Sequence, residues 1–339
     1  MNTGPLQIEV TRGGHVESRH AVTVAVVDAA GRTRLALGDV ARPVFPRSAI
    51  KVIQALPLVE SGAADALGLG TAELALAGAS HSGEEIHVET ARAMLARVGR
   101  DETCLVCGPH WPRREVDVAR LGRDGRAPTR LHNNCSGKHA GFVCLACHTG
   151  IDPTGYGDVD HPIQREIAAA IEDVTGVDLA AAPHGMDGCS IPTWAVPLDR
   201  LAHGFARLGT GRGLAPARAA AARRLLDAAC AEPHMIAGTD RFCTDFIRAL
   251  GGRDYVKLGA EGVYGAVLPD LGLGVAVKCA DGAVRAGEVA AAHVVARLLG
   301  RADDPALARF LRPRLRDWNG AEVGDLRVTA EDGARLVLG

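Results

Sequence analysis

Strand-like segments stand at both ends of this chain, and helical sequence separates them. Near the start, "QIEVTRGG" and "HAVTVAVVDAAGRTRLALG" are rich in alternating β-branched residues, and Asp28 to Gly31 predict a hairpin turn. Near the end, "DYVKLGAEGVYGAVLPDLGLGVAVKCADG" again predicts strands, with Pro-Asp-Leu-Gly and Ala-Asp-Gly turns between them. Because strands need partners, we expect the two ends of the chain to build one antiparallel sheet packed against helices.

The middle of the chain predicts a mainly helical lobe. Helical segments are "TAELALAGASHSGEEIHVETARAMLARVG", interrupted at Gly-Ala-Ser, then "GKHAGFVCLACHTG", "HPIQREIAAAIEDVTG" and "LAPARAAAARRLLDAACAEP", and "RAGEVAAAHVVARLLG" predicts a closing helix. "CLVCGPHWP" predicts a short buried strand. The expected fold is therefore mixed α/β (α+β), a single catalytic domain over residues 1–339. Its sheet subdomain would come from about 5–75 and 250–339, and its helical lobe from about 76–249.

Charge and hydropathy exclude several classes of protein. The chain has 38 Lys plus Arg and 40 Asp plus Glu, and the formal charge of 38 − 40 = −2 gives no electrostatic footprint for nucleic acid or an anionic membrane surface. No long apolar run predicts a membrane span. The start of the chain has no apolar segment typical of a signal peptide, so we expect a cytoplasmic protein.

A serine and a lysine occur three residues apart in "VFPRSAIKVIQALPLVESGA". Pro46 suits the first turn of a helix, on which Ser48 and Lys51 would share a face. A neutral amine within reach can activate a hydroxyl as a nucleophile. The alternative is an ordinary exposed Ser and Lys on an amphipathic helix. Pro57, about a turn after Ile53, predicts that the helix is kinked or in two pieces.

Two further positions could join this chemistry. In "AGASHSGEEIH", small residues around Ser80 allow close backbone approach, whereas Ser82 predicts a helix N-cap with Glu85 as its capping-box partner. Lys257, in a late strand followed by glycines, can reach inward to an active site. Its alternative role is that of a surface lysine on an edge strand.

Two polar clusters predict a metal site. "LHNNCSGKHAGF" and "HGMDGCSIPTW" each carry one cysteine among other donors, and general ligand preferences select Cys135 and Cys189 with His139 or Asp187. The number of cysteines is odd, which favours free thiols or metal ligands over a disulfide framework.

The remaining cysteines offer a competing metal site. Cys104-x2-Cys107 and Cys144-x2-Cys147 have the spacing of a four-thiolate zinc site. We disfavour it, because "TCLVCG" predicts a buried strand and "VCLAC" an apolar helix stripe, where cysteine acts as a small hydrophobic residue. Three lone thiols are likewise assigned to packing: Cys230, Cys243 and Cys279.

Taken together, the motifs resemble a known enzyme family. "FPRSAIKV", "ASHSGEEIH", "CGPHWP", "HNNCSGKHAGF", "DGCSIPTWAVPL", "GTDRFCTDF" and "KLGAEGVYGAVLP" are similar, in order, to those of the Rhizobium etli-type (class 3, asparaginase II family) L-asparaginases, from about residue 8 to about residue 300. The resemblance implies a fold like that of serine β-lactamases and serine glutaminases. It also implies hydrolysis of L-asparagine to L-aspartate and ammonia by a zinc-containing homodimer.

The resemblance also implies roles for particular residues, and every matching position is present. Two Ser-Lys pairs would be catalytic, and a zinc ion would be held by two thiols and a lysine amine, a ligand that general preferences do not select. The pairs are Ser48 with Lys51 and Ser80 with Lys257, and the zinc ligands are Cys135, Lys138 and Cys189. The zinc would order the loops that hold His139 and Asp187 near the α-amino or α-carboxylate group of the substrate. Arg47 would pair with a carboxylate or be a surface charge.

Two other classes of protein stay open. A related serine acyl hydrolase, of the glutaminase or the β-lactamase and peptidase type, could use the same Ser-x-x-Lys geometry, although the Ser-Asp-Asn and Lys-Thr-Gly motifs are absent. A zinc-stabilised ligand-binding protein would turn over no amide. Ammonia release from asparagine and glutamine, measured beside hydrolysis of a chromogenic cephalosporin, separates these classes.

Overall fold

The computed structural model describes residues 4–336, and the chain divides into two compact units. Within the described residues, the sheet unit takes in residues 4–49, 195–212 and 246–336, and the helical unit takes in residues 50–194 and 213–245. These bounds differ from those expected from the sequence: residues 50–75 belong to the helical unit and residues 195–212 to the sheet unit. That the whole chain is one catalytic domain stays a prediction.

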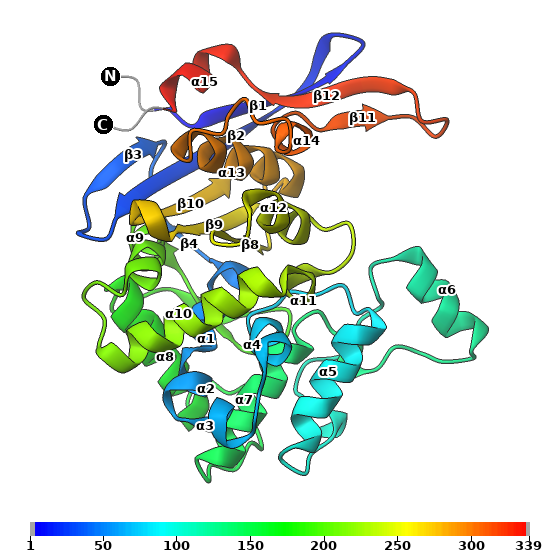
Figure 1. The fold of residues 1–339 in the computed structure, drawn as a ribbon, viewed down its shortest axis with the longest axis vertical. Coiled ribbons are helices and arrows are strands. Elements are labelled where there is room, and N and C mark those ends of the chain that lie inside the picture. Colours follow the sequence, from blue (N-terminus) through cyan, green and yellow to red (C-terminus); the bar gives the residue numbers. More distant parts are fainter. Residues whose placement is uncertain (1–3, 337–339) are drawn as a thin grey trace. The chain divides into compact units, whose positions relative to one another are not determined.

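Strands from both ends of the chain pair in one antiparallel sheet, as the sequence predicted (Figure 1). Within the described residues it has eight strands in the order β11-β12-β1-β2-β10-β9-β8, with β3 paired to β2. The strands are β1 (Leu6–Arg12), β2 (His15–Asp28), β3 (Thr33–Leu37), β8 (Tyr255–Gly259), β9 (Val263–Leu268), β10 (Leu273–Cys279), β11 (Arg314–Arg316) and β12 (Glu322–Val328). The short strands β4 (Pro43–Val44) and β7 (Val196–Pro197) pair separately.

Helices α9 (Leu198–Thr210) and α13 (Val284–Leu298) cover opposite faces of this sheet. A Cβ on Gly265 of β9 would lie 2.2 Å from the ring of Phe205 in α9. The next residue back, Tyr264, packs against Gly287 of α13. Since successive strand residues point to opposite faces, the two helices lie on different sides. The sheet unit also contains α14 (Ala308–Leu311) and α15 (Ala330–Arg335), and α12 (Phe242–Leu250) begins in the helical unit.

The helical unit packs around α7, which is buried from Ser136 to Ala146. Its helices are α1 (Lys51–Gln54), α2 (Leu56–Glu60), α3 (Ala63–Ala66), α4 (Thr71–Ala77), α5 (Glu85–Ala96), α6 (Glu115–Arg123), α7 (Ser136–His148), α8 (Pro162–Thr175), α10 (Pro216–Ala231) and α11 (Pro233–Ala237). A two-stranded hairpin, β5 (His184–Met186) with β6 (Pro192–Trp194), completes it. No helix among residues 4–336 is long and apolar enough to cross a membrane.

Two local predictions have different outcomes. The helix after Pro46 is in two pieces, as its proline indicated: the 3-10 helix η1 (Arg47–Ile50) leads into α1, and α2 begins after Ala55 with Pro57 in its first turn. The strand predicted in "CLVCGPHWP" is wrong, because the segment is a 3-10 turn (η2, Glu102–Cys104) followed by irregular chain. Side chains satisfy its backbone instead of a neighbouring strand: the N–H of Val106 donates to the Tyr156 hydroxyl at 3.1 Å.

Candidate active site

The segment that carries Ser48 lies against the sheet of its own unit, on the face of β8 that Lys257 shares. A Cβ on Gly259 would be 2.4 Å from the carbonyl oxygen of Pro46 and 3.3 Å from the nitrogen of Ala49, so only glycine permits this approach. Lys257, two residues before Gly259, points to the same face. It is 1% exposed, and its Nζ donates to the carbonyl of Leu258 at 2.9 Å. Lys257 is therefore buried and is no exposed edge-strand charge.

Arg47 holds a strained backbone conformation directly before Ser48. Its φ is 51°, in the left-handed region that costs a residue with a side chain about 1 kcal/mol or more. The N–H of Ala49 closes the turn by donating to the carbonyl of Pro46 at 3.0 Å. Both Arg47 and Ser48 are half-buried. Strain of this kind is found at functional sites, where the surrounding structure maintains it.

Lys51 is buried within the helical unit and makes two polar contacts. Its Nζ, in a side chain 1% exposed, donates to the carbonyl of Ala79 at 2.6 Å and to Cys135 Sγ at 3.0 Å. A neutral amine has two N–H groups and one lone pair. The two contacts use both N–H groups, so the lone pair of a neutral Lys51 is left to accept a proton.

Ser80 follows Ala79 and has its own polar partner. Asn134 donates from Nδ2 to Ser80 Oγ at 3.1 Å, and the carbonyl of Asn134 accepts the N–H of His81 at 3.0 Å. Because the Ser80 oxygen accepts, its hydroxyl proton can be donated elsewhere. Sequence reasoning did not select Asn134 as a site residue, although it lies in the polar cluster just before α7.

The three predicted zinc ligands meet in the helical unit. Cys135 immediately precedes α7, Lys138 lies in its first turn, and Cys189 lies in the turn of the β5–β6 hairpin. The side chains of Cys135 and Cys189 are hydrogen-bonded to each other, and Lys138 Nζ donates to Cys189 Sγ at 3.1 Å. All three residues are at most 5% exposed. A tight turn supports Cys189: the N–H of Asp187 donates to Ile191, 2.8 Å away.

Charge in this cluster is concentrated on Cys135. The hydrogen bond from the Cys189 thiol, together with the cations of Lys51 and Lys138, holds the pKa of Cys135 well below its usual range. The same hydrogen bond and burial raise the pKa of Cys189. Burial alone would lower the pKa of Lys138, but the charges of Cys189, Cys135 and Asp187 outweigh it and raise the pKa. The two sulfurs and the Lys138 nitrogen already touch, and they fit a borderline-soft ion such as zinc once Cys189 and Lys138 give up their protons.

The other metal candidates do not assemble among the described residues. Among the described residues, neither His139 nor Asp187 forms a set with both Cys135 and Cys189 within 4.8 Å, and the choice of metal ligands stays a prediction. The four remaining candidate thiols do not converge either, and three of them donate to different carbonyls. These contacts are Cys104 to Asp101, Cys107 to Arg130 and Cys144 to Met94.

His139 has a buried ring nitrogen that no neighbouring group uses. The Tyr156 hydroxyl accepts the N–H of Val106 and lies within hydrogen-bond distance of His139 Nδ1, at 2.6 Å. Burial, with the charges of Lys138 and Lys51, keeps the pKa of His139 well below its usual range. The ring is therefore neutral, and its Nε2 is buried and makes no hydrogen bond within residues 4–336. In the tautomer with the proton on Nε2, this nitrogen can donate to a substrate oxygen.

Three stacked imidazoles lie beside Ser80 in the chain. The rings of His81, His87 and His234 stack with centroids 4.8 and 5.4 Å apart. His81 Nδ1 accepts the N–H of Gly83, so its Nε2 donates to Ser136 Oγ at 3.0 Å. Burial first, and neighbouring cations second, lower the pKa of His81 well below its usual range. The hydrogen bond of His81 thus connects the residue after Ser80 to the residue after Cys135.

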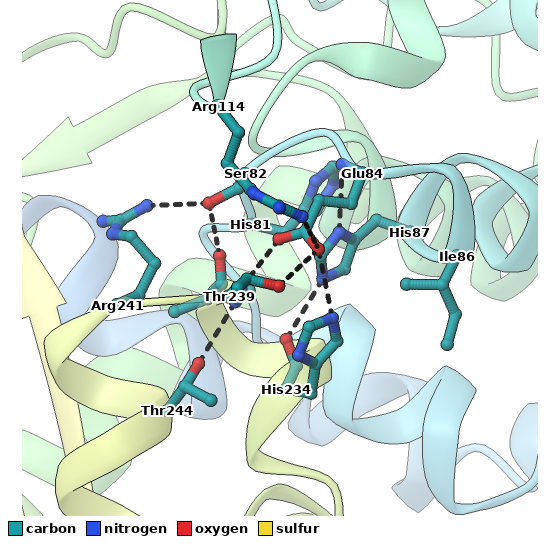
Figure 2. Close-up of polar contacts among 12 residues, drawn as sticks. His81, Ser82, Glu84, Ile86, His87, Arg114, His234, Thr239, Arg241 and Thr244 are labelled. Atoms are coloured by element: carbon teal, nitrogen blue, oxygen red, sulfur yellow. Dashed lines mark hydrogen bonds and ion pairs between the residues drawn. The ribbon is translucent and has the colours of Figure 1, made fainter. Parts of the chain in front are cut away.

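Glu84, and not Ser82, stands at the start of α5. Figure 2 shows the Glu84 carboxylate between Thr239, His234 and Arg114. It accepts the Thr239 N–H at 2.7 Å and the Thr239 hydroxyl at 2.8 Å. The predicted Ser82 cap with Glu85 is wrong, because the Ser82 hydroxyl donates instead to the carbonyl of Ala237 at 2.8 Å.

Buried lysines, serine hydroxyls and a neutral histidine donor are groups of an enzyme that hydrolyses amides or esters through proton transfer. The comparisons identify the family: the chain matches L-asparaginase II over residues 8–328 and belongs to that family. Amide hydrolysis of asparagine is the activity that this family implies. No curated protein matches the chain.

Two solved structures are distantly similar. One, "Crystal Structure Analysis of Mglu in its native form", is 15% identical with a TM-score of 0.39; the match covers 84% of this chain and 65% of that one. Mglu in 4.3 M NaCl is 17% identical with a TM-score of 0.35, covering 79% and 60%. The chain thus spans less than two thirds of each, and likeness at this level carries no argument about fold or function.

Proposed function

We propose that the chain is a serine-type amidohydrolase of the Rhizobium etli type that converts L-asparagine to L-aspartate and ammonia. Family membership supports the reaction, and the family pattern supports Ser48 as nucleophile. One structural observation supports the mechanism: Lys51, three residues after Ser48, is buried, and its Nζ makes two contacts that would leave the lone pair of the deprotonated amine unused. We further propose that the fold is serine β-lactamase-like. We also propose that the enzyme is a homodimer, and sedimentation velocity tests this oligomeric state.

In the proposed reaction, Lys51 Nζ takes the hydroxyl proton of Ser48. Ser48 Oγ then forms a bond to the carboxamide carbon of the substrate, and the C–N bond breaks as the nitrogen takes a proton and leaves as ammonia. Water then hydrolyses the resulting aspartyl ester: its oxygen bonds to the acyl carbon, the C–O bond to Ser48 breaks, and Ser48 Oγ regains a proton. Ser80, with its oxygen held by Asn134, and Lys257 form the second pair and relay or orient protons.

Three side chains would orient the substrate. His139 Nε2–H would donate to a carboxylate or carboxamide oxygen, and Asp187 would accept from the α-ammonium group. Arg47 would pair with the α-carboxylate. A zinc ion would be held by Cys135, Lys138 and Cys189, and when bound it would supply a fixed positive charge that orders α7 and the β5–β6 turn.

Substitution of the nucleophile tests this function. Ser48→Ala should lower ammonia release from asparagine by about three orders of magnitude and leave the zinc content unchanged. Ser61→Ala, at an exposed serine after α2, is the matched control. After acid quenching, mass spectrometry should find an aspartyl adduct on Ser48 of the wild type. Turnover of Ser48→Ala within about tenfold of the wild type would remove Ser48 from the nucleophile role.

Parallel assays decide between the related functions. Faster ammonia release from glutamine than from asparagine would identify a glutaminase, and hydrolysis of a chromogenic cephalosporin would identify a β-lactamase-type enzyme. Absence of turnover with every amide would identify a zinc-stabilised binding protein. We expect asparagine to be the preferred substrate, with the same Ser48 dependence for any side activity.

A further inference from the structure

A second group of metal-ligand side chains lies in the sheet unit, and it includes none of the residues assigned to the proposed asparaginase reaction. His20 on β2, Cys279 at the end of β10 and Asp281 just after it place one ligand atom each within 4.8 Å of one another. Among residues 4–336 this is the one such group of three or more His, Cys, Asp or Glu residues. The sequence assigned Cys279 to packing.

Strand register brings these side chains together. Cys279 pairs with Val22 of β2, so both point to the same face of the sheet. His20 is two residues from Val22 and shares that face. The loop after β10 then returns Asp281 to the pair, with the N–H of Ala280 donating to the carbonyl of Ala21 at 2.8 Å. The group is therefore held by the rigid centre of the sheet.

The contacts form a continuous set of donors around one carboxylate. Asp281 Oδ2 lies 2.6 Å from His20 Nδ1, and Asp281 Oδ1 accepts from Cys279 Sγ at 2.9 Å. The side chain of Asp281 is half exposed, whereas His20 and Cys279 are buried. Asp281 also lines a cavity of about 480 Å³, which gives an ion a path to the group.

We propose that His20, Cys279 and Asp281 form a second metal site, for a borderline-soft divalent ion such as zinc. An imidazole nitrogen, a thiolate and a carboxylate are three of the ligand types that zinc uses, and the solvent-exposed side of Asp281 leaves a fourth position for water. On binding, the thiol of Cys279 loses its proton to solvent, and the ion replaces the hydrogen bonds that now join the three side chains. Hard ions such as Mg²⁺ prefer all-oxygen sites.

Arg285 provides a feature that separates a metal site from a merely structural network. Its Nη2 lies 3.4 Å from Nε2 of His20, and its side chain is exposed. A guanidinium there repels a bound cation and must turn toward solvent. Removing it should therefore tighten metal binding, by about tenfold for a divalent ion and a unit charge roughly 6 Å apart in water. A structural network without a metal gives no such gain.

Cobalt binding to metal-depleted enzyme tests the proposal. The Cys135→Ser/Cys189→Ser variant, which lacks two ligands of the proposed zinc site, should still bind one Co²⁺ per chain with thiolate-to-cobalt absorption. Adding Cys279→Ser or His20→Asn should remove that ion and its absorption, and Cys230→Ser should be a silent control. Arg285→Ala should bind more tightly, and Mg²⁺ should not compete.

Wild-type stoichiometry keeps the test decisive should the double variant fail to fold. The wild type should bind two Co²⁺ ions, and Cys279→Ser alone should bind one. An unchanged stoichiometry and spectrum in Cys279→Ser, or a soluble double variant without cobalt absorption, would overturn the second site. These readouts need no turnover, so the result is independent of the proposed asparaginase reaction.

Discussion

At the scale of single residues, the proposed chemistry depends on Lys51 acting as a base, which requires its amine to lose a proton. Its contacts with Ala79 and Cys135 use two donors and leave one acceptor. Lys51→Arg keeps a cation of similar length, but a guanidinium stays protonated and cannot act as a base. We expect kcat/KM for asparagine to fall by about two to three orders of magnitude, nearly as far as in Lys51→Ala.

The lysine on β10 provides the control for that substitution. Lys278→Arg makes the same chemical change at a side chain that donates to backbone carbonyls in the sheet unit, and it should leave kcat/KM within about twofold of the wild type. Substantial activity in Lys51→Arg, at wild-type zinc content and with an unchanged pH profile, would move the base role to Lys257.

A second residue-scale prediction concerns stability, because Asp254 is poorly placed for a charge. Burial and the neighbouring carboxylate of Asp270 raise the pKa of Asp254 from 3.8 to about 6. Above pH 6 the folded state therefore holds a charge that it disfavours, and below about pH 4 the carboxyl is protonated in both states, so the cost disappears.

Asp254→Asn should accordingly stabilise the protein at pH 7.5 by about 1 kcal/mol, a value that allows for the partial exposure of the side chain. The gain should shrink as the pH falls from 6 toward 4. Urea unfolding at several pH values measures it, with Asp124→Asn at an exposed position on the other unit as the control. A loss of stability at pH 7.5 would contradict the burial argument.

At the scale of elements, Glu84 joins the start of α5 to the segment that follows α11. Burial alone would raise its pKa, but the hydrogen bonds from Thr239 outweigh this and lower the pKa from 4.5, with His87 and His234 adding to the effect. A lowered pKa contributes stability that is present above about pH 4.5 and is lost as the pH falls through the folded value.

Glu84→Gln should therefore destabilise the enzyme at pH 7 by about 1–3 kcal/mol, the range for hydrogen bonds to a charged group. The difference from the wild type should narrow as the pH falls below 4.5 and through the folded-state pKa, because the wild-type carboxyl then also becomes neutral. Thermal unfolding from pH 4 to 8 measures this. Glu85→Gln, at the exposed next residue, is the control, and a pH-independent loss would show that shape and not charge matters at Glu84.

The elements predicted from the sequence are those with strong local signals. The alternating β-branched residues and the turn after Asp28 correctly predicted the first strands, and Pro57 correctly indicated a broken helix. Failures occurred where distant side chains supply the hydrogen bonds. The Tyr156 hydroxyl accepts the N–H of Val106, and the backbone carbonyl of Ala237 accepts the hydroxyl proton of Ser82. The strands β11 and β12 also escaped prediction, because their place in the sheet depends on pairing with β1 and with each other.

The residues of the candidate site likewise divide into those that local sequence selects and those that depend on distant contacts. Residue type and local clustering were enough to select Cys135 and Cys189, whereas Lys138 came only from the family resemblance. Asn134 and His234 were missed, because their roles depend on contacts with residues 54 and 150 positions away. Spacing in a single sequence carries no information about partners at such separations.

At the scale of the whole molecule, the proposed zinc ligands all belong to the helical unit. A metal that binds only the folded chain stabilises it by about 2.7 kcal/mol at a hundred times its dissociation constant. Because Cys135 and Lys138 stand at the start of α7 and Cys189 in the β5–β6 turn, the ion would cross-link two segments of one unit. Its loss should loosen these segments before any others.

Hydrogen exchange in Cys135→Ser/Cys189→Ser tests this whole-molecule expectation. Compared with the wild type, the variant should lose one equivalent of zinc and exchange about tenfold faster, or more, at residues 131–139 and 184–194. Exchange in β1, β2 and β10 should be unchanged, since those strands contain none of the substituted ligands. Cys144→Ser/Cys147→Ser alters two thiols later in α7 and should keep its zinc and its protection. Equal acceleration in both units would show that the ion supports the entire fold, and full zinc retention would remove Cys135 and Cys189 as its ligands.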